Sequence, residues 1–274
     1  MSDNKSPLVS VVMATFNEPA EYVTLAIQSI LNQSYTNIEL LIADDSINSE
    51  TIDAIDKFSG NEKVRILREP ARLGFVPSLN KCIRLAKGEF IARMDGDDIS
   101  FPNRIAMQVD KLTQDDSISV LGGNTKLFIG DKDNIIGEKK YPQKGVALRL
   151  RTIFRCPLAH PTVMFRRRVF DDGFFYNENY KKAEDLYLWL KLLKKHYRIE
   201  NLNEYVLYFR RSEDFMKRRT GSHLKYNLKA RLECFDWLHP LFSIFSCFNA
   251  LILFVIPKSL YALIYNRFDK KKRD

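Results

Sequence analysis

The stretch FIARMDGDD, residues 90–98, reads as an apolar β-strand that ends in three acidic residues. Gly96 lies between Asp95 and Asp97 and lets the backbone bend, so both carboxylates can converge on one small volume. Crowded carboxylates repel each other, and their hard oxygen atoms suit Mg²⁺ or Mn²⁺. The stretch therefore predicts a divalent-metal site on Asp95 and Asp97. The alternative is an acidic turn that caps a helix beginning near Pro102.

The residues before this stretch alternate between apolar runs and segments with helical spacing. We expect strands at residues 8–14, 38–43, 64–67 and 88–94, and helices at residues 22–33, 50–58 and 78–86. Alternation at this spacing predicts right-handed βαβ units and a parallel sheet. In such sheets, ligands bind beyond the carboxyl ends of the strands.

Polar or acidic residues follow three of these expected strands: TFNE at residues 15–18, the pair Asp44–Asp45, and Asp95–Asp98. Three such ends in one half of a sheet predict a pocket for a metal–nucleotide complex. The chain contains neither G-x-G-x-x-G nor G-x-x-x-x-G-K-[ST]. A nicotinamide dinucleotide fold and a P-loop are therefore not indicated.

The second part of the chain is less regular. Strands are expected at residues 118–121 and 125–129, with Gly122–Gly123 between them, and a polar loop is expected at residues 130–144.

Three titratable side chains stand out in this second part. His160 directly precedes an apolar strand, within CPLAHPTVMFRR at residues 156–167. Glu184 and Asp185 open an apolar helix at residues 184–193. Carboxylates in a first helical turn are favoured by the helix dipole, so helix capping is the simple interpretation of this pair.

Length and composition are those of an ordinary globular protein of one or two domains: 274 residues, 45% hydrophobic and 28% charged. The formal net charge of +9 is unevenly spread, at −6 for residues 1–131, +13 for residues 132–231 and +2 for residues 232–274. The basic part suggests a surface for anions, namely substrate phosphates, membrane headgroups or nucleic acid, and a merely solvated surface is the alternative.

The four cysteines, Cys82, Cys156, Cys234 and Cys247, are widely spaced and include no C-x-x-C. Neither a zinc site nor a disulfide framework is indicated, so we expect reduced thiols. Residues 1–7 contain no apolar segment of a signal peptide, which predicts a cytoplasmic location.

Residues 237–257 form an uncharged, phenylalanine-rich segment of 21 residues. About 20 apolar residues can cross a bilayer, but two prolines and several polar residues weaken this segment as a span. Basic clusters lie on both sides, at residues 217–219 and 270–273. We expect residues 232–274 to be a tail that lies in a membrane interface, the alternative being a helical hairpin buried against the rest of the protein.

Three motifs in fixed order carry a resemblance to a known family: VSVVMATFN at residues 9–17, IADDS at 42–46 and AKGEFIARMDGDD at 86–98. They are similar to those of inverting family-2 glycosyltransferases with a GT-A fold, in particular bacterial enzymes that build O-antigen, capsule or other surface polysaccharides. The resemblance covers about residues 7–210. It implies an α/β fold, a Rossmann-like mixed sheet flanked by helices, here with a C-terminal apolar helical extension.

The resemblance also implies roles for the residues that follow the first strands. Ala14 and Thr15 would line the nucleotide base through their backbone, with Glu18 nearby. Asp45 would accept a hydrogen bond from a pyrimidine ring. Asp95 would contact the ribose or a metal-bound water, and Asp97 would bind Mn²⁺ or Mg²⁺ directly.

For the second part, the resemblance implies acceptor binding and catalysis. Asp185 matches the catalytic base, Glu184 is its neighbour, and His160 matches a histidine near the acceptor. Residues 1–131 would then bind the nucleotide sugar, and residues 132–231 would bind the acceptor within the same domain.

Together, these observations predict a metal-dependent inverting hexosyl- or N-acetylhexosaminyltransferase that uses a UDP-linked donor. Its acceptor would be a lipid-linked saccharide at the cytoplasmic face of the inner membrane. One rival is a sugar-phosphate nucleotidyltransferase, but the first strand is not followed by a glycine-rich loop with Arg and Lys. The other is a nucleic-acid-binding protein, which needs a basic and aromatic groove where this chain has acidic strand ends.

Overall fold

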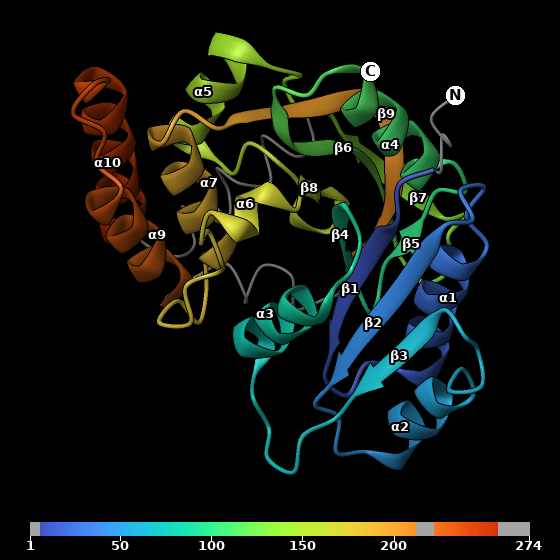
Figure 1. Ribbon diagram of the computed structural model, residues 1–274. Coiled ribbons are helices and arrows are strands. Elements are labelled where there is room, and N and C mark those ends of the chain that lie inside the picture. Colours follow the sequence, from blue (N-terminus) through green and yellow to red (C-terminus); the bar gives the residue numbers. More distant parts are fainter. Residues whose placement is uncertain (1–5, 212–221, 257–274) are drawn as a thin grey trace.

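The computed structural model describes residues 6–211 and 222–256. Its first half is a parallel sheet in the order β3-β2-β1-β4, seen in blue to teal in Figure 1. The strands and their helices follow the predicted alternation: β1 (Val9–Thr15), α1 (Ala20–Leu31), β2 (Ile38–Asp44), α2 (Ser49–Asp56), β3 (Val64–Leu67), α3 (Phe75–Leu85) and β4 (Phe90–Asp95). The predicted parallel half-sheet is therefore confirmed.

The sheet continues past β4 without a break, in the order β8-β6-β9-β5, with β7 paired to β6. Strand β8 is antiparallel to both β4 and β6, whereas β6 and β9 run parallel. These strands are β5 (Ile99–Ser100), β6 (Ile118–Phe128), β7 (Ile135–Lys139), β8 (Met164–Arg166) and β9 (Arg198–Arg210). The sheet is thus mixed, and the two predicted functional halves of the domain share it.

Helices cover both faces of the sheet, and β1 is therefore buried along its whole length. Val9, Val11 and Met13 pack on one face with α1 and with α4 (Arg104–Gln114). Val12 and Ala14 pack on the other face with α3 and with α7 (Glu184–Lys194). The shorter elements are α5 (Gly145–Phe154), a 3₁₀ turn at His160–Thr162 and α6 (Arg168–Asp171).

Two expectations for the second part were wrong. Gly122–Gly123 does not separate two strands, because β6 is continuous from Ile118 to Phe128. A side chain at Gly123 would lie 2.7 Å from a methyl group of Val206, so glycine permits close packing against β9 here and does not break the strand. The polar stretch 130–144 is not all loop, since it contains β7, which pairs antiparallel with β6.

The described C-terminal residues 222–256 fold into a helix pair, of which residues 232–256 belong to the predicted tail. Helix α9 (Ser222–Glu233) packs against α7, and α10 (Pro240–Val255) packs against α9 and α5. Figure 1 shows α10 at the outer edge of the molecule. Within residues 6–211 and 222–256, no helix is long and apolar enough to cross a membrane. The basic clusters at residues 217–219 and 270–273 lie outside the described residues.

Candidate active site

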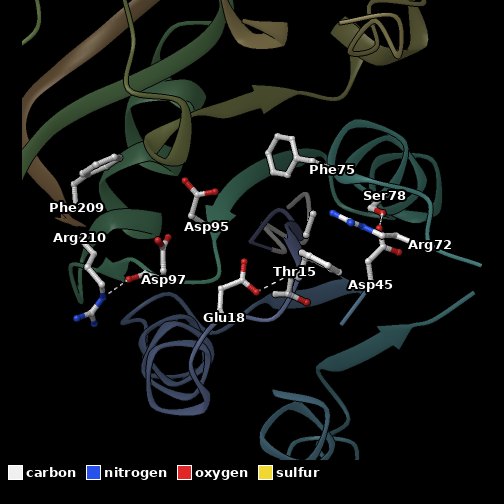
Figure 2. A pocket seen from close by; sticks show the side chains of 12 residues that line it. Thr15, Glu18, Asp45, Arg72, Phe75, Ser78, Asp95, Asp97, Phe209 and Arg210 are labelled. Carbon is white, nitrogen blue, oxygen red and sulfur yellow. Dashed lines mark hydrogen bonds between the residues drawn. The ribbon is translucent and has the colours of Figure 1, made fainter. Parts of the chain in front are cut away.

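A cavity of about 340 Å³ opens at the carboxyl ends of β1, β2 and β4. Its lining includes every residue predicted to bind the nucleotide sugar or the metal, namely Ala14, Thr15, Glu18, Asp45, Asp95 and Asp97. Figure 2 shows these side chains around one space, with Asp45 on one side and Asp97 on the other. They converge because the parallel strands β2, β1 and β4 are neighbours and end at the same edge of the sheet.

Asp45 is held by the segment that begins α3. Its carboxylate accepts hydrogen bonds from the backbone N–H of Gly74 (2.7 Å) and from the hydroxyl of Ser78 (3.0 Å). Gly74 has a φ of 89°, which favours glycine, and it lies directly before the helix. The carboxylate therefore has a fixed direction at the cavity wall.

Arg72 supplies a positive charge to the same wall. Its guanidinium carbon lies 3.4 Å from the centre of the Phe16 ring, and both residues line the cavity. Stacking on an aromatic face holds the guanidinium group without using its N–H donors. Arg72 is thus placed to meet an anionic group in the cavity.

Glu18 lies opposite the aspartates and accepts a hydrogen bond from the backbone N–H of Phe16 (2.7 Å). Burial raises the pKa of Glu18 to about 7, and the negative charges of Asp97 and Asp95 add to this effect. The site therefore concentrates more carboxylates than it can keep ionised without a cation.

Asp95, Asp97 and Asp98 place carboxylate oxygens within 4.8 Å of one another. Asp98 accepts a hydrogen bond from the backbone N–H of Arg210 (2.7 Å), and its other oxygen is buried without a hydrogen-bond partner among the described residues. Burial, followed by the charges of Asp97 and Asp95, raises the pKa of Asp98 well above its usual range. This crowded, oxygen-only set fits a hard divalent cation.

Arg210 holds the acidic turn in place. Its Nε donates to the carbonyl oxygen of Asp97 (2.7 Å), and its guanidinium group lies 3.7 Å from the centre of the Tyr22 ring. Arg210 and Phe209 also line the cavity. Neither is among the predicted site residues, because both lie on β9, a strand that was not expected. The continuous apolar and aromatic run YVLYF at residues 205–209 is the signal that would have indicated this strand.

Arg93 lies next to the cavity residue Asp95, on the same face of β4. It is 3% exposed and forms an ion pair with Asp95, while its Nε and Nη1 have no hydrogen-bond partner among the described residues. The ring of Phe75, which lines the cavity, lies 5.4 Å from the guanidinium carbon. Arg93 is thus a buried cation beside the acidic turn.

A second cluster lies beyond Phe75, whose ring centre is 6.3 Å from that of His160. The Nε2 of His160 is 2.8 Å from the hydroxyl of Tyr176, and its Nδ1 is 4.0 Å from a carboxylate oxygen of Glu184. Burial, followed by the charge of Arg93, lowers the pKa of His160 well below its usual range. The imidazole is therefore neutral, and its contact with Glu184 is not an ion pair.

The acidic pair at the start of α7 belongs to this second cluster. Burial, followed by the charge of Asp185, raises the pKa of Glu184 to about 8. Asp185 accepts hydrogen bonds from the backbone N–H of Leu186 (2.7 Å) and from the thiol of Cys156 (3.4 Å). The structure thus groups Glu184 with His160 next to the cavity, although none of His160, Glu184 and Asp185 is among the residues that line it.

Comparison with known proteins identifies the family of this chain. Residues 10–174 match the family model of glycosyl transferase family 2. The chain is 29% identical to "Putative glycosyltransferase EpsE" of Bacillus subtilis, over 98% of this chain and 95% of the relative. It is 31% identical to "UDP-Glc:alpha-D-GlcNAc-diphosphoundecaprenol beta-1,3-glucosyltransferase WfgD" of Escherichia coli, over 68% of this chain and 70% of the relative.

Among solved structures, the fold is similar to that of the mannosyltransferase PcManGT of Pyrobaculum calidifontis, solved in complex with GDP-Man and Mn²⁺. The TM-score is 0.65 and the sequence identity 16%, over 98% of this chain and 82% of that one. At this identity the likeness shows a shared fold, a GT-A type mixed sheet flanked by helices.

Proposed function

The chain belongs to glycosyl transferase family 2, and we propose that it is an inverting enzyme. It would move a sugar from a UDP-linked donor to a hydroxyl of a lipid-linked saccharide. The observation that carries the proposal is the convergence of Asp45, Asp95 and Asp97 in one cavity, next to the acidic pair of α7. Residues 1–131 would bind the donor, and residues 132–231 would bind the acceptor and supply the base.

The donor nucleotide would lie along the carboxyl ends of β1 and β2. The backbone of Ala14 and Thr15 would line the base, with Glu18 nearby, and the fixed carboxylate of Asp45 would accept a hydrogen bond from a pyrimidine N–H. Arg72 would face the diphosphate, since it is the cation stacked at the cavity wall. A UDP-linked donor is also named for the similar glucosyltransferase of E. coli.

Asp97 and Asp95 would hold Mn²⁺ or Mg²⁺, next to the buried carboxylate of Asp98. When bound, the cation supplies positive charge that stabilises the leaving diphosphate. The solved PcManGT complex contains Mn²⁺. In the protein itself, Arg210 keeps the acidic turn in place through its bond to the backbone of Asp97.

We assign the role of general base to Asp185. It would take the proton of the acceptor hydroxyl, whose oxygen then bonds to the anomeric carbon while the bond to the diphosphate breaks on the opposite face. Glu184, whose pKa is about 8, would hold a proton at neutral pH and donate a hydrogen bond to the acceptor. His160, neutral and bonded to Tyr176, would orient the same acceptor.

The acceptor would be a lipid-linked saccharide, met at the cytoplasmic face of the inner membrane during synthesis of a bacterial surface polysaccharide. The name of the E. coli relative includes a diphosphoundecaprenol-linked acceptor. Its match to this chain, at 31% identity, supports the same class of acceptor here.

A donor screen tests the proposal. The purified protein is incubated with UDP-, GDP- and dTDP-sugars and Mn²⁺, and the released nucleotide is measured with and without a lipid-linked acceptor. We expect release from at least one UDP-sugar, and its loss in Asp45→Asn, which keeps the shape of the side chain. Release from GDP-sugars alone would contradict the assignment of a pyrimidine pocket at Asp45. Release from dTDP-sugars alone would keep the pyrimidine pocket but contradict a UDP-linked donor.

A further inference from the structure

Helix α10 turns its apolar side to solvent. Most of its exposed apolar positions recur every three or four residues and form one stripe, with relative exposures between 42% and 68% at Leu241, Ile244, Phe245, Phe248, Leu251, Ile252 and Val255. Phe254, which is 47% exposed, lies outside this stripe. The helix contains no charged residue. A surface helix of a globular protein normally exposes polar residues, whereas α10 is apolar on its outward side as well as on much of its inward side.

The inward side of α10 combines apolar residues, such as Ala250 and Leu253, with two polar ones, and hydrogen bonds of the polar residues fix it. The hydroxyl of Ser246 accepts from the buried Arg231 of α9, whose guanidinium group also donates to the carbonyl oxygen of Thr152 on α5. The side-chain amide of Asn249 donates to the carbonyl oxygen of Ile153 (3.1 Å). Rotating the helix to bury its apolar stripe would leave these buried polar groups unpaired, which is costly. The protein is therefore built to present the stripe.

Helix α5, which packs against α10, carries a second exposed apolar stripe. Val146, Leu150 and Phe154 are spaced four residues apart and are 67%, 47% and 61% exposed. The turn before α10 adds Trp237 and Leu238, which are 79% and 71% exposed. We call these two stripes and this turn the α5–α10 face. Figure 1 shows its helices at the edge of the molecule, with α9 between α10 and α7.

The charge around this face favours an anionic partner. Residues 144–155 contain four basic and no acidic side chains. Residues 222–256 contain two acidic side chains and three basic ones, of which Arg231 is buried. The sequence that follows, residues 257–274, contains six basic and two acidic side chains. Basic residues beside an apolar, aromatic helix face are the composition of segments that bind anionic lipid surfaces.

The geometry favours a helix that lies in the membrane surface. With 16 residues and a rise of about 1.5 Å per residue, α10 is about 24 Å long, which is less than the roughly 30 Å thickness of a hydrocarbon core. One side of α10 is also occupied by α5 and α9. Only its outward stripe is free to enter lipid.

We propose that the α5–α10 face docks on an anionic phospholipid bilayer, with the apolar side chains of α10 and α5 inserted among the acyl chains and the basic side chains at the headgroups. Docking of this kind would hold the catalytic cavity at the surface where a lipid-linked acceptor is embedded. This purpose rests on the proposed function, whereas the docking itself is a separate property.

Vesicle flotation tests the docking. The full-length protein is mixed with vesicles of equal parts phosphatidylcholine and phosphatidylglycerol, or of phosphatidylcholine alone, and centrifuged through a density gradient. We expect wild type to float with the anionic vesicles, less with the neutral ones, and less again at high salt. Phe245→Glu with Phe248→Glu, and Val146→Glu with Phe154→Glu, should each weaken binding at least tenfold.

The matched control is Asn61→Glu with Gln114→Glu, which adds the same charge at exposed positions elsewhere and should float like wild type. Nucleotide release from the donor in the absence of acceptor should be equal in all variants, because none of them changes the cavity. Flotation itself needs no donor, so a wrong donor assignment would not affect its result. The proposal is overturned if wild type stays at the bottom of the gradient or if the face variants float equally well. The proposal is also overturned if wild type forms a dimer that the substitutions in the α5–α10 face disrupt, because a second copy of the chain would then cover this face.

Discussion

Replacing Glu184 by Gln should make the protein more stable at alkaline pH. Glu184 is 14% exposed in its side chain, lies beside Asp185 and has a neutral histidine as its neighbour. Burial, followed by the charge of Asp185, raises its pKa from 4.5 to about 8. Glutamine has the shape of the protonated glutamic acid but cannot ionise, so the substitution removes only the cost of ionisation.

The size of the effect follows from the pKa difference. Below about pH 4.5 the carboxyl group is protonated in both states, and above about pH 8 it is ionised in both. Between these values only the unfolded state gives up the proton, so the free energy of unfolding falls as pH rises. A difference of about 3.5 pKa units corresponds to at most about 5 kcal/mol. The attraction of the ionised group to Arg93 already lowers the pKa and is included in this figure.

Urea denaturation of wild type and Glu184→Gln from about pH 5 to about pH 9 measures the effect. The two proteins should be about equally stable at the acid end, and the variant should be more stable by several kcal/mol at the alkaline end. Glu62→Gln, a substitution at an exposed glutamate, should follow wild type throughout. Parallel curves for wild type and Glu184→Gln would refute the argument that the folded site keeps Glu184 protonated.

Other substitutions test the remaining parts of the account. Asp97→Ala should lower the transfer rate by orders of magnitude and abolish calorimetric Mn²⁺ binding without unfolding the protein; wild-type rates in this variant or in excess EDTA would remove the metal assignment. Asp185→Asn should still bind the UDP-sugar but transfer ~10²–10⁴-fold more slowly, and a normal transfer rate would leave this residue a helix cap only. Gly88→Ala should destabilise the protein by more than ~3 kcal/mol, because the added carbon would lie 2.5–2.8 Å from backbone atoms, whereas Gly60→Ala, with open space around it, should change thermal stability little.

The fold of the first half could be predicted because its signals are local. Apolar runs such as Ile38–Ala43 stop at acidic residues, and helical spacing follows them. The convergence of Asp45, Asp95 and Asp97 in one cavity could also be predicted, because neighbouring parallel strands end at one edge of the sheet.

The remainder depends on contacts between distant residues, which local patterns do not encode. The backbone N–H of Arg210 is bonded to the side chain of Asp98, 112 residues away, and nothing near either residue indicates the other. Gly123 looks like a strand break until Val206 is packed against it. Likewise, α10 reads as a uniformly apolar segment, and the hydrogen bonds of Ser246 to Arg231 and of Asn249 to Ile153 show which of its sides faces the protein.

The anomeric configuration of the product shows whether the enzyme transfers the sugar with inversion. The donor found in the nucleotide screen is incubated with the lipid-linked acceptor and Mn²⁺, and the new glycosidic linkage is examined by proton NMR. Direct displacement, assisted by a base at Asp185, predicts a configuration opposite to that of the sugar in the donor. A product that retains the donor configuration would contradict the single-displacement mechanism.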